Sequence, residues 1–429
     1  MMSQSRKLTV YIVDDSRTHA DIARALLEKE GHTVVINQSS DEALREIPEQ
    51  NPDCVVVDIM MPGLDGYELC RRLRSIRHLA RTKLVIMSTK AYDSDRKRAF
   101  DLGANGYFVK PLHPAAFVAE LERIVAETLV MTFWGVRGTL PVSRRDSVRY
   151  GGNTSCVSLG FPDGRLLVLD AGTGIKALGD ALTAARRSRI DGRILISHPH
   201  WDHINALPFF TPFYAQGNQF EICGPAHGQA TMRDLISVQM DGVYFPVTTR
   251  EFSASVTYRD LGVGRLDLGD LTLDTMLLRH PGNCLGYRIQ HGARSICYVT
   301  DNELYPPEHA LHSDEYLERL TEFTRGADVL ITDCTYTDEE YRRRAGWGHS
   351  CVSQVADLAW RARVRTLYLV HHDPDQNDAA IDGKLDRARE LLRARGAATE
   401  VYAPTEYAEV EVSGAGASPT ASPAPSASS

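Results

Sequence analysis

The chain has 429 residues, of which 48 are Lys or Arg and 56 are Asp or Glu, giving a formal net charge of −8 and a pI of about 6.0. This length suffices for two or three domains with buried cores, and the acidic balance argues against a protein that binds nucleic acid over its whole surface. No apolar run approaches the roughly 20 residues of a membrane span, the N-terminus lacks a signal-type apolar core, and the eight cysteines include no CxxC pair. We therefore expect a cytoplasmic protein with free thiols and no membrane association.

The first third of the chain alternates between two kinds of pattern. Strand-like apolar runs lie at residues 8–13, 33–36, 54–57, 83–87 and 107–109. Segments with helical periodicity lie between and after them, for example residues 19–30 and 115–128. Alternating strands and helices predict a doubly wound parallel sheet, an α/β fold of (βα)5 type whose functional residues lie at the carboxyl ends of the strands.

Polar residues stand at those strand ends. Asp14 and Asp15 follow the first strand, Asp58 the third, Thr89 the fourth and Lys110 the fifth. Three carboxylates that meet at one edge repel each other unless a cation lies among them, and Mg²⁺ prefers such oxygen ligands. The sequence therefore predicts a magnesium site formed by Asp14, Asp15 and Asp58.

This arrangement resembles the receiver domain of two-component response regulators, over residues 7–128. The resemblance implies that Asp58, which opens the run Asp-Ile-Met-Met-Pro-Gly-Leu-Asp-Gly, accepts a phosphoryl group. It also implies that Thr89 is the switch hydroxyl, Lys110 the phosphate-binding lysine and Tyr107 the switch aromatic. Lys90 departs from the pattern, because a small residue usually follows the switch hydroxyl. The expected partner is a sensor histidine kinase or a phosphotransfer protein.

The segment His198-Pro-His200-Trp-Asp202-His203 follows the apolar run 193–197, which is typical of a strand. In an extended chain, residues two apart face the same side, so His198 and His200 can bind one metal. Asp202 and His203 follow after a bend and can reach a second metal. The alternative is a loop that is rich in His for no functional reason.

Residues of the same types close other apolar runs. Asp170 follows residues 166–169, His280 follows 277–279, Asp301 follows 296–300, and His371 and His372 follow 367–370. A site for two metals needs more ligands than one segment supplies, and these strand ends offer them. Only one residue of the adjacent pair can face the metals. We favour His371, because it directly ends the strand, and keep His372 as the alternative.

In this order the motifs resemble the metallo-β-lactamase superfamily, over residues 131–412. The resemblance implies an αββα sandwich with its site between the edges of two mixed sheets. It also implies two divalent metals, Zn²⁺ or Mn²⁺, since both accept imidazole and carboxylate ligands. The implied ligands are His198, His200 and His280 for one metal and Asp202, His203 and His371 for the other, with Asp301 bridging. Asp170 would orient a ligand loop, and Asp202 also counts among the catalytic residues.

Three further segments resemble the branch of ribonuclease Z and phosphoribosyl cyclic phosphodiesterase. They are residues 133–138 (Phe-Trp-Gly-Val-Arg-Gly), residues 151–156 (Gly-Gly-Asn-Thr-Ser-Cys) and residues 348–350 (Gly-His-Ser). The resemblance implies that His349 is a catalytic residue beside the scissile phosphate; the alternative is that it caps the following helix. The run Arg342-Arg-Arg344 could bind phosphate, but such a run is more often a solvated helix face.

We therefore expect a response regulator whose output is a dinuclear-metal hydrolase, which cleaves a small phosphodiester under the control of Asp58 phosphorylation. Two alternatives stay open: hydrolysis of a lactone or thioester, and a phosphorylation-dependent docking module without turnover. A tRNA substrate is not expected, because the tRNA-binding arm of ribonuclease Z would not fit between His280 and Asp301. A very short junction at about residues 129–132 favours rigid docking of the two domains, and a homodimer is left open. Residues 413–429, rich in Ser, Ala and Pro, are expected to be disordered.

Overall fold

The structure is a computed structural model that describes residues 7–412 apart from residues 80, 81, 91, 113, 127, 128, 162–164, 185–189 and 270. The chain falls into two compact units, residues 1–128 and 129–429, and each is described by itself. The tail 413–429, for which we predict disorder, lies outside the described residues. Within the described part, no helix combines the length and the apolar character needed to cross a bilayer.

The first unit contains one parallel sheet. Its strands are β1 (Thr9–Val13), β2 (Thr33–Asn37), β3 (Cys54–Val57), β4 (Lys83–Ser88) and β5 (Gly106–Val109). They lie in the order β2-β1-β3-β4-β5, and every neighbouring pair is parallel. The central strands are rich in β-branched residues and buried on both faces, as parallel sheets require. The predicted doubly wound sheet is thereby confirmed.

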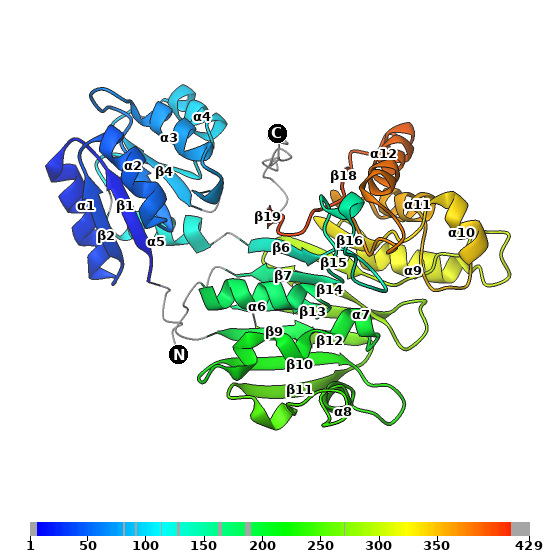
Figure 1. The fold of residues 1–429 in the computed structure, drawn as a ribbon. Helices are drawn as coiled ribbons and strands as arrows, with labels where there is room; N and C mark the ends of the chain where they lie inside the picture. The colour runs from blue at the N-terminus through cyan, green and yellow to red at the C-terminus, as the bar shows by residue number, and fades with distance from the viewer. Residues whose placement is uncertain are drawn as a thin grey trace. The chain divides into compact units, whose positions relative to one another are not determined.

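Helices cover both faces of this sheet (Figure 1). They are α1 (Arg17–Lys29), α2 (Ser40–Gln50), α3 (Gly66–Arg74), α4 (Asp93–Asp101) and α5 (Pro114–Ala126), with a 3-10 turn η1 at Arg77–Leu79. α1 and α5 pack against one face through Leu27 and Phe117, whereas α2 and α3 pack against the other through Ile47 and Leu69. The carboxyl ends of the strands are thus held at one edge.

The described residues of the second unit form two seven-stranded mixed sheets, ordered β11-β10-β9-β8-β7-β6-β19 and β12-β13-β14-β15-β16-β17-β18. The strands of the first are β6 (Leu129–Gly135), β7 (Cys156–Gly160), β8 (Leu166–Leu169), β9 (Asp191–Leu195), β10 (Gln219–Pro225), β11 (Ser255–Leu261) and β19 (Glu409–Val412). Those of the second are β12 (Gly264–Asp267), β13 (Leu271–Leu277), β14 (Leu285–His291), β15 (Arg294–Val299), β16 (Val329–Asp333), β17 (Thr366–Val370) and β18 (Glu400–Tyr402).

The two sheets face each other across an apolar core that includes Phe133, Leu169, Tyr287 and Ile331. Helices cover the outer faces (Figure 1). They are α6 (Gly174–Ala184), α7 (Trp201–Ile204) and α8 (Met232–Val238) over the first sheet, and α9 (Asp314–Thr324), α11 (Val352–Ala362) and α12 (Asp378–Ala394) over the second. Helix α10 (Asp338–Arg344) and 3-10 turns at Arg145–Ser147, Leu207–Phe209, Thr211–Tyr214 and Thr249–Glu251 lie in connections. The predicted αββα sandwich is thereby confirmed.

Most predicted strands end where the sequence indicated, one or two residues before a candidate ligand. The segment before His280 differs, because β13 ends at Leu277 and His280 lies in the following loop. The chain turns there through Pro281 and Gly282, and Gly282 has a φ of 95°. Proline and a left-handed glycine cannot continue a strand, which explains the earlier end.

Candidate metal centre

The His198–His203 segment forms a tight bend at the end of β9. His200 is the N-cap of the short helix α7, and this helix turns Asp202 and His203 inward behind it. The side chains of His198 and His203 are fully buried. One short segment thus aims imidazoles from its extended part and from its helical part at the same region.

The first group of candidate ligands comprises His198, His200, His280 and Asp301. One ligand atom from each lies within 4.8 Å of the others. Asp301 Oδ2 lies 3.6 Å from His198 Nε2 and 3.7 Å from His280 Nε2. His280 Nε2 and His200 Nδ1 are 3.1 Å apart. His198, His200 and His280 are the ligands that the resemblance implied for one metal, and Asp301 is the residue expected to bridge the two metals.

The second group comprises Asp202, His203 and His371, whose ligand atoms also lie within 4.8 Å of one another. Asp202 Oδ2 lies 3.2 Å from His203 Nε2 and 3.1 Å from His371 Nε2. Asp301 faces this group with its other oxygen, since Oδ1 lies 3.4 Å from His203 Nε2 and 3.2 Å from His371 Nε2. One carboxylate therefore stands between the two groups, as a bridging ligand would.

The pKa shifts of three residues of the first group, His198, His280 and Asp301, suit a metal. Burial lowers the pKa of His198 well below its usual range, and burial also lowers the pKa of His280. Burial opposes ionisation of Asp301, but His371, His203 and His198 outweigh it and hold the pKa of this carboxyl well below its usual range. Neutral imidazoles and ionised carboxylates are the forms that bind metals.

Two buried ring nitrogens test whether these residues fit a divalent metal. His198 Nε2 and His203 Nε2 are buried and have no hydrogen-bond partner among the described residues. Unsatisfied buried polar atoms are rare in folded proteins and need an explanation. Two such nitrogens, both facing the carboxylate of Asp301, fit ligation of a divalent cation that accepts nitrogen and oxygen donors.

Asp170 is buried at the end of β8 and supports both His203 and its loop. Its Oδ2 accepts hydrogen bonds from His203 Nδ1 (2.7 Å), Ser197 Oγ (2.8 Å) and Tyr298 Oη (2.7 Å), and its Oδ1 accepts one from the Ser197 amide (2.7 Å). The hydrogen on His203 Nδ1 leaves Nε2 with its lone pair directed at the second group. The sequence predicted that Asp170 would orient a ligand loop, and these contacts support that role.

The geometry favours His371 over His372. His371 has a φ of 57°, which turns its ring into the second group, where Thr335 Oγ1 lies 3.2 Å from its Nδ1. Gly138 lies directly beside this ring, because a Cβ there would come within 2.1 Å of it. His372 is also fully buried but belongs to neither group, and its ring instead meets Tyr150 at 6.1 Å.

His349 lies at the same centre. Its ring stacks on that of His371 at 5.0 Å, and its Nδ1 lies 3.5 Å from Asp333 Oδ2 and 4.0 Å from Asp301 Oδ2. Burial would lower the pKa of His349, but the neighbouring carboxylates of Asp333 and Asp301 raise it above its usual value. The helix-capping alternative does not match the structure, because the N-cap of α11 is Cys351.

The sequence interpretation missed Asp333. This carboxylate ends β16, and its Oδ2 also accepts the amide hydrogen of Ser350 (3.1 Å), which ties the His349 loop to the sheet. A strand-end carboxylate was the same signal that identified Asp170 and Asp301, so Asp333 could have been found.

The three arginines of residues 342–344 lie in different surroundings. Arg342 and Arg343 are exposed on α10, as expected of a solvated helix face. Arg344 instead pairs with Asp373, with Nη1 and Oδ2 2.5 Å apart, and its guanidinium lies over the ring of Tyr336 at 5.0 Å. The first two arginines carry no sign of a phosphate site.

In the first unit, the structure brings together part of the predicted constellation. Lys110 Nζ lies 2.8 Å from Asp14 Oδ2 and 2.6 Å from Asp58 Oδ2. Tyr107 is buried, and its hydroxyl donates to the Lys90 carbonyl (2.9 Å).

Two residues predicted for this site are exposed to solvent, and one residue that the sequence interpretation did not name lies beside Asp14, Asp58 and Lys110. Asp15 and Thr89 are exposed at the ends of β1 and β4. His19, which the sequence interpretation missed, groups with Asp14 and Asp58, and its Nδ1 lies 3.2 Å from Lys110 Nζ. Helix α1 places it there, one turn after the acidic pair.

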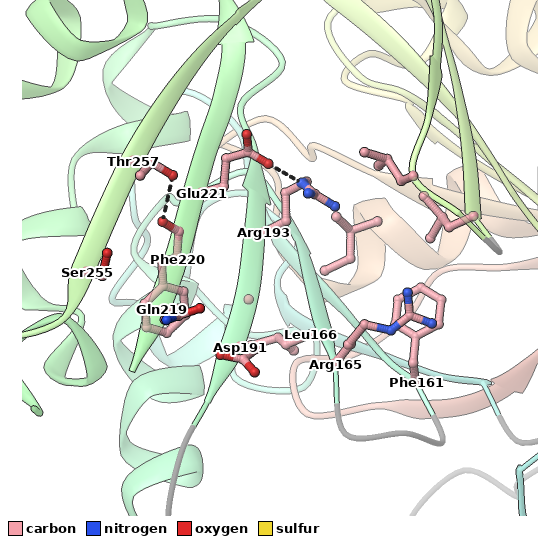
Figure 2. Close-up of a pocket in the computed structure, with 14 residues that line it drawn as sticks. Phe161, Arg165, Leu166, Asp191, Arg193, Gln219, Phe220, Glu221, Ser255 and Thr257 are labelled. Atoms are coloured by element: carbon pink, nitrogen blue, oxygen red, sulfur yellow. Dashed lines mark hydrogen bonds and ion pairs between the residues drawn. The ribbon is translucent and has the colours of Figure 1, made fainter. Parts of the chain in front are cut away.

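A cavity of about 350 Å³ lies at the other ends of the strands of the second unit. It is lined by the first residues of β9, β10 and β11 (Figure 2). The His and Asp groups follow the opposite ends of the strands, so the cavity lies away from them. Glu221 in its wall binds Arg193 at 2.7 Å (Figure 2) and also Arg259 at 2.6 Å. Glu221 is thus paired with both guanidinium groups, and we assign the cavity no chemistry.

Comparison with known proteins identifies both units. Residues 10–122 match the family described as "Response regulator receiver domain", and residues 165–372 match "Beta-lactamase superfamily domain". The chain therefore joins a response regulator receiver domain to a metallo-β-lactamase-fold domain. A receiver takes its phosphoryl group from a phosphodonor such as a histidine kinase, and the second match supports a hydrolase.

Individual relatives cover parts of the chain. The transcriptional regulatory protein ResD of Bacillus subtilis is 30% identical over 124 residues, which are 29% of this chain and 50% of that protein. The gliding motility regulatory protein of Myxococcus xanthus is 37% identical over 106 residues, 25% of this chain and 14% of that protein. The chain thus spans half or less of the length of these relatives. The metallo-β-lactamase-fold protein YhfI from Bacillus subtilis covers 66% of this chain and 99% of its own, at 18% identity and a TM-score of 0.48.

Proposed function

We propose that the metallo-β-lactamase-fold domain is a dinuclear-metal hydrolase that cleaves phosphodiesters, and that phosphorylation of Asp58 controls it in the cytoplasm. One observation carries the proposal: two groups of His and Asp side chains share Asp301, which turns one oxygen toward each group. In the receiver, we propose that Asp14, Asp15 and Asp58 hold Mg²⁺ for phosphoryl transfer.

The chemistry follows from these residues. His198, His200 and His280 would hold one Zn²⁺ or Mn²⁺, and Asp202, His203 and His371 the other. When bound, such a pair lowers the pKa of water and offsets negative charge in the transition state.

His349 supplies the proton in this proposal. The carboxylates of Asp333 and Asp301 raise its pKa and so offset part of the positive charge of the metals beside it. It can donate to the leaving oxygen of an ester, which is the task of a general acid. Asp333, 3.5 Å from Nδ1, orients the ring.

A small phosphodiester fits better than tRNA. Between His280 and Asp301 the chain forms only the short turn and the hairpin of β14 and β15, and every residue of this stretch is described. No inserted arm that could grip a large nucleic acid is present in this stretch.

A substrate screen with metal analysis tests the proposal. We expect two divalent metals per chain and turnover of bis-p-nitrophenyl phosphate that stops after treatment with a chelator. Faster turnover of lactones or thioesters would replace the phosphodiester by these substrates. Binding of metal without turnover of any ester would favour a docking module.

The Asp301→Ala variant tests the shared carboxylate. We expect it to lose one metal and its turnover, because both groups lose the carboxylate that they share. Asp386→Ala, on an 80% exposed residue of α12, is the control for removal of a carboxylate. Full metal content with normal turnover in Asp301→Ala would contradict the ligand assignment.

A further inference from the structure

The loop of residues 346–350 touches the candidate centre with its backbone as well as with His349. The Gly348 carbonyl lies 2.9 Å from His280 Nδ1. A carbonyl only accepts, so Nδ1 carries the hydrogen and Nε2 keeps its lone pair for a ligand bond. Gly348 has a φ of 87°, and a Cβ at this residue would come within 2.4 Å of His280 Nδ1. The loop therefore fixes the tautomer of His280 only while its backbone stays in this conformation.

Glu303 holds that backbone. Its side chain is fully buried, and the carboxylate accepts hydrogen bonds from the amides of Gly346 (2.6 Å) and Gly348 (2.7 Å) and from the hydroxyl of Tyr341 (2.9 Å). The two amides bind different oxygens of the carboxylate. Hydrogen bonds to a charged acceptor are shorter and stronger than neutral ones, so this side chain restrains the loop at two points.

The same segment of chain carries Asp301. Ser350 Oγ donates to the Asn302 carbonyl (2.5 Å) and accepts from the Leu304 amide (3.2 Å). Residues 301–304 thus tie the shared carboxylate to the loop through backbone and side-chain bonds. A shift of one segment would displace the other.

We infer that Glu303 is a positioning residue of the metal centre, which sets His280 as a ligand and His349 as an acid by holding the backbone of residues 346–350. This role rests on the proposed metal centre. Glu303 lies too deep behind the loop to act on substrate itself, since its carboxylate is occupied by the loop amides and Tyr341. Outer partners of metal ligands commonly change metal affinity or activity by about 10- to 100-fold when they are replaced.

Glu303→Gln in the full-length protein tests the inference. The amide group keeps one acceptor oxygen, so its NH₂ must face at least one donor of the set Gly346, Gly348 and Tyr341. We expect the weaker-bound of two Zn²⁺ ions to lose about 10- to 100-fold in affinity, measured by competition with a chelator, and kcat to fall by a similar factor with KM little changed. Glu339→Gln, on an exposed residue of the same helix as Tyr341, removes the same charge and should leave both values unchanged.

Hydrogen exchange separates this inference from the proposed function. In metal-depleted full-length protein, the amides of residues 346–350 should exchange at least about 10-fold faster in Glu303→Gln than in the wild type or Glu339→Gln. Tyr341→Phe removes one hydrogen bond to Glu303 but places no new donor against the loop amides. It should therefore increase exchange of the same amides by a smaller factor, and it keeps the test available if Glu303→Gln folds poorly. Unchanged exchange, metal affinity and kcat in both variants would overturn the inference. If the wild type binds no metal but exchange is faster in Glu303→Gln, the proposed metal centre is refuted. Glu303 then only stabilises the loop of residues 346–350.

Discussion

The substitution Asp170→Asn tests how strongly the surroundings of a candidate ligand determine metal binding. Asp170 is fully buried and accepts hydrogen bonds from His203, Tyr298 and both donors of Ser197. Asn keeps one accepting oxygen, but its NH₂ must replace the other. The two hydroxyl donors can rotate and accept instead. His203 cannot do so unless its hydrogen moves to Nε2, which faces the second group of ligands.

The expected loss of metal affinity follows from the hydrogen bond that His203 Nδ1 donates to Asp170. A lost hydrogen bond to a charged acceptor costs about 1.5–3 kcal/mol, which corresponds to roughly 10- to 100-fold in affinity. We therefore expect Asp170→Asn to weaken one metal by about this factor, measured by chelator competition, and to lower kcat without a large change in KM.

Asp180→Asn on α6, where the side chain is 56% exposed, is the matched control and should behave like the wild type. A variant that binds both metals with wild-type affinity while remaining folded would refute the reasoning, because His203 would then not depend on Asp170 for its tautomer.

Three further experiments address catalysis, control and stability. His349→Ala should lower kcat by roughly 10²- to 10⁴-fold with both metals retained, and loss of a metal would make His349 a ligand instead. Beryllofluoride should change kcat/KM at least several-fold in the wild type and have no effect in Asp58→Ala; identical kinetics despite binding at Asp58 would contradict control by the receiver. Burial lowers the pKa of Lys384 to about 8. Since an unfolded lysine titrates near 10.4, the folded state binds fewer protons between these values, and the wild type should gain roughly 3 kcal/mol over Lys384→Met from about pH 7.5 to 10.5. Urea unfolding followed by tryptophan fluorescence measures this gain, because all four tryptophans lie in the second unit, and a pH-independent difference would exclude it.

The sequence predicted the strands of the first unit and, in the second, only those that precede candidate ligands, because these buried strands are continuous apolar runs that end in polar residues. The choice of His371 over His372 illustrates this. His371, the residue directly after β17, enters the second group, and the next residue, His372, is buried elsewhere.

The residues that the sequence did not identify act across long separations. Tyr298 meets Asp170 from 128 positions away, and Glu303 meets Gly348 from 45. A buried Tyr or Glu in an apolar stretch gives no local sign of its partner. His280 lies in the first group, but its strand ends at Leu277, earlier than the apolar pattern suggests, because the chain turns before Pro281.

The backbone gives an argument for function that does not depend on resemblance. Asp170, Asp301 and His371 have φ values of 58°, 47° and 57°, in the left-handed region that costs residues with a Cβ about 1–3 kcal/mol each. Glycine would adopt this conformation freely but could not offer an oxygen or a nitrogen to the centre. All three residues follow strand ends, and in each case the side chain turns into the same buried group of His and Asp. A fold maintained for stability alone would gain by relieving this strain. Its presence at three converging positions is best explained by a requirement for these side chains, which is what a metal centre imposes.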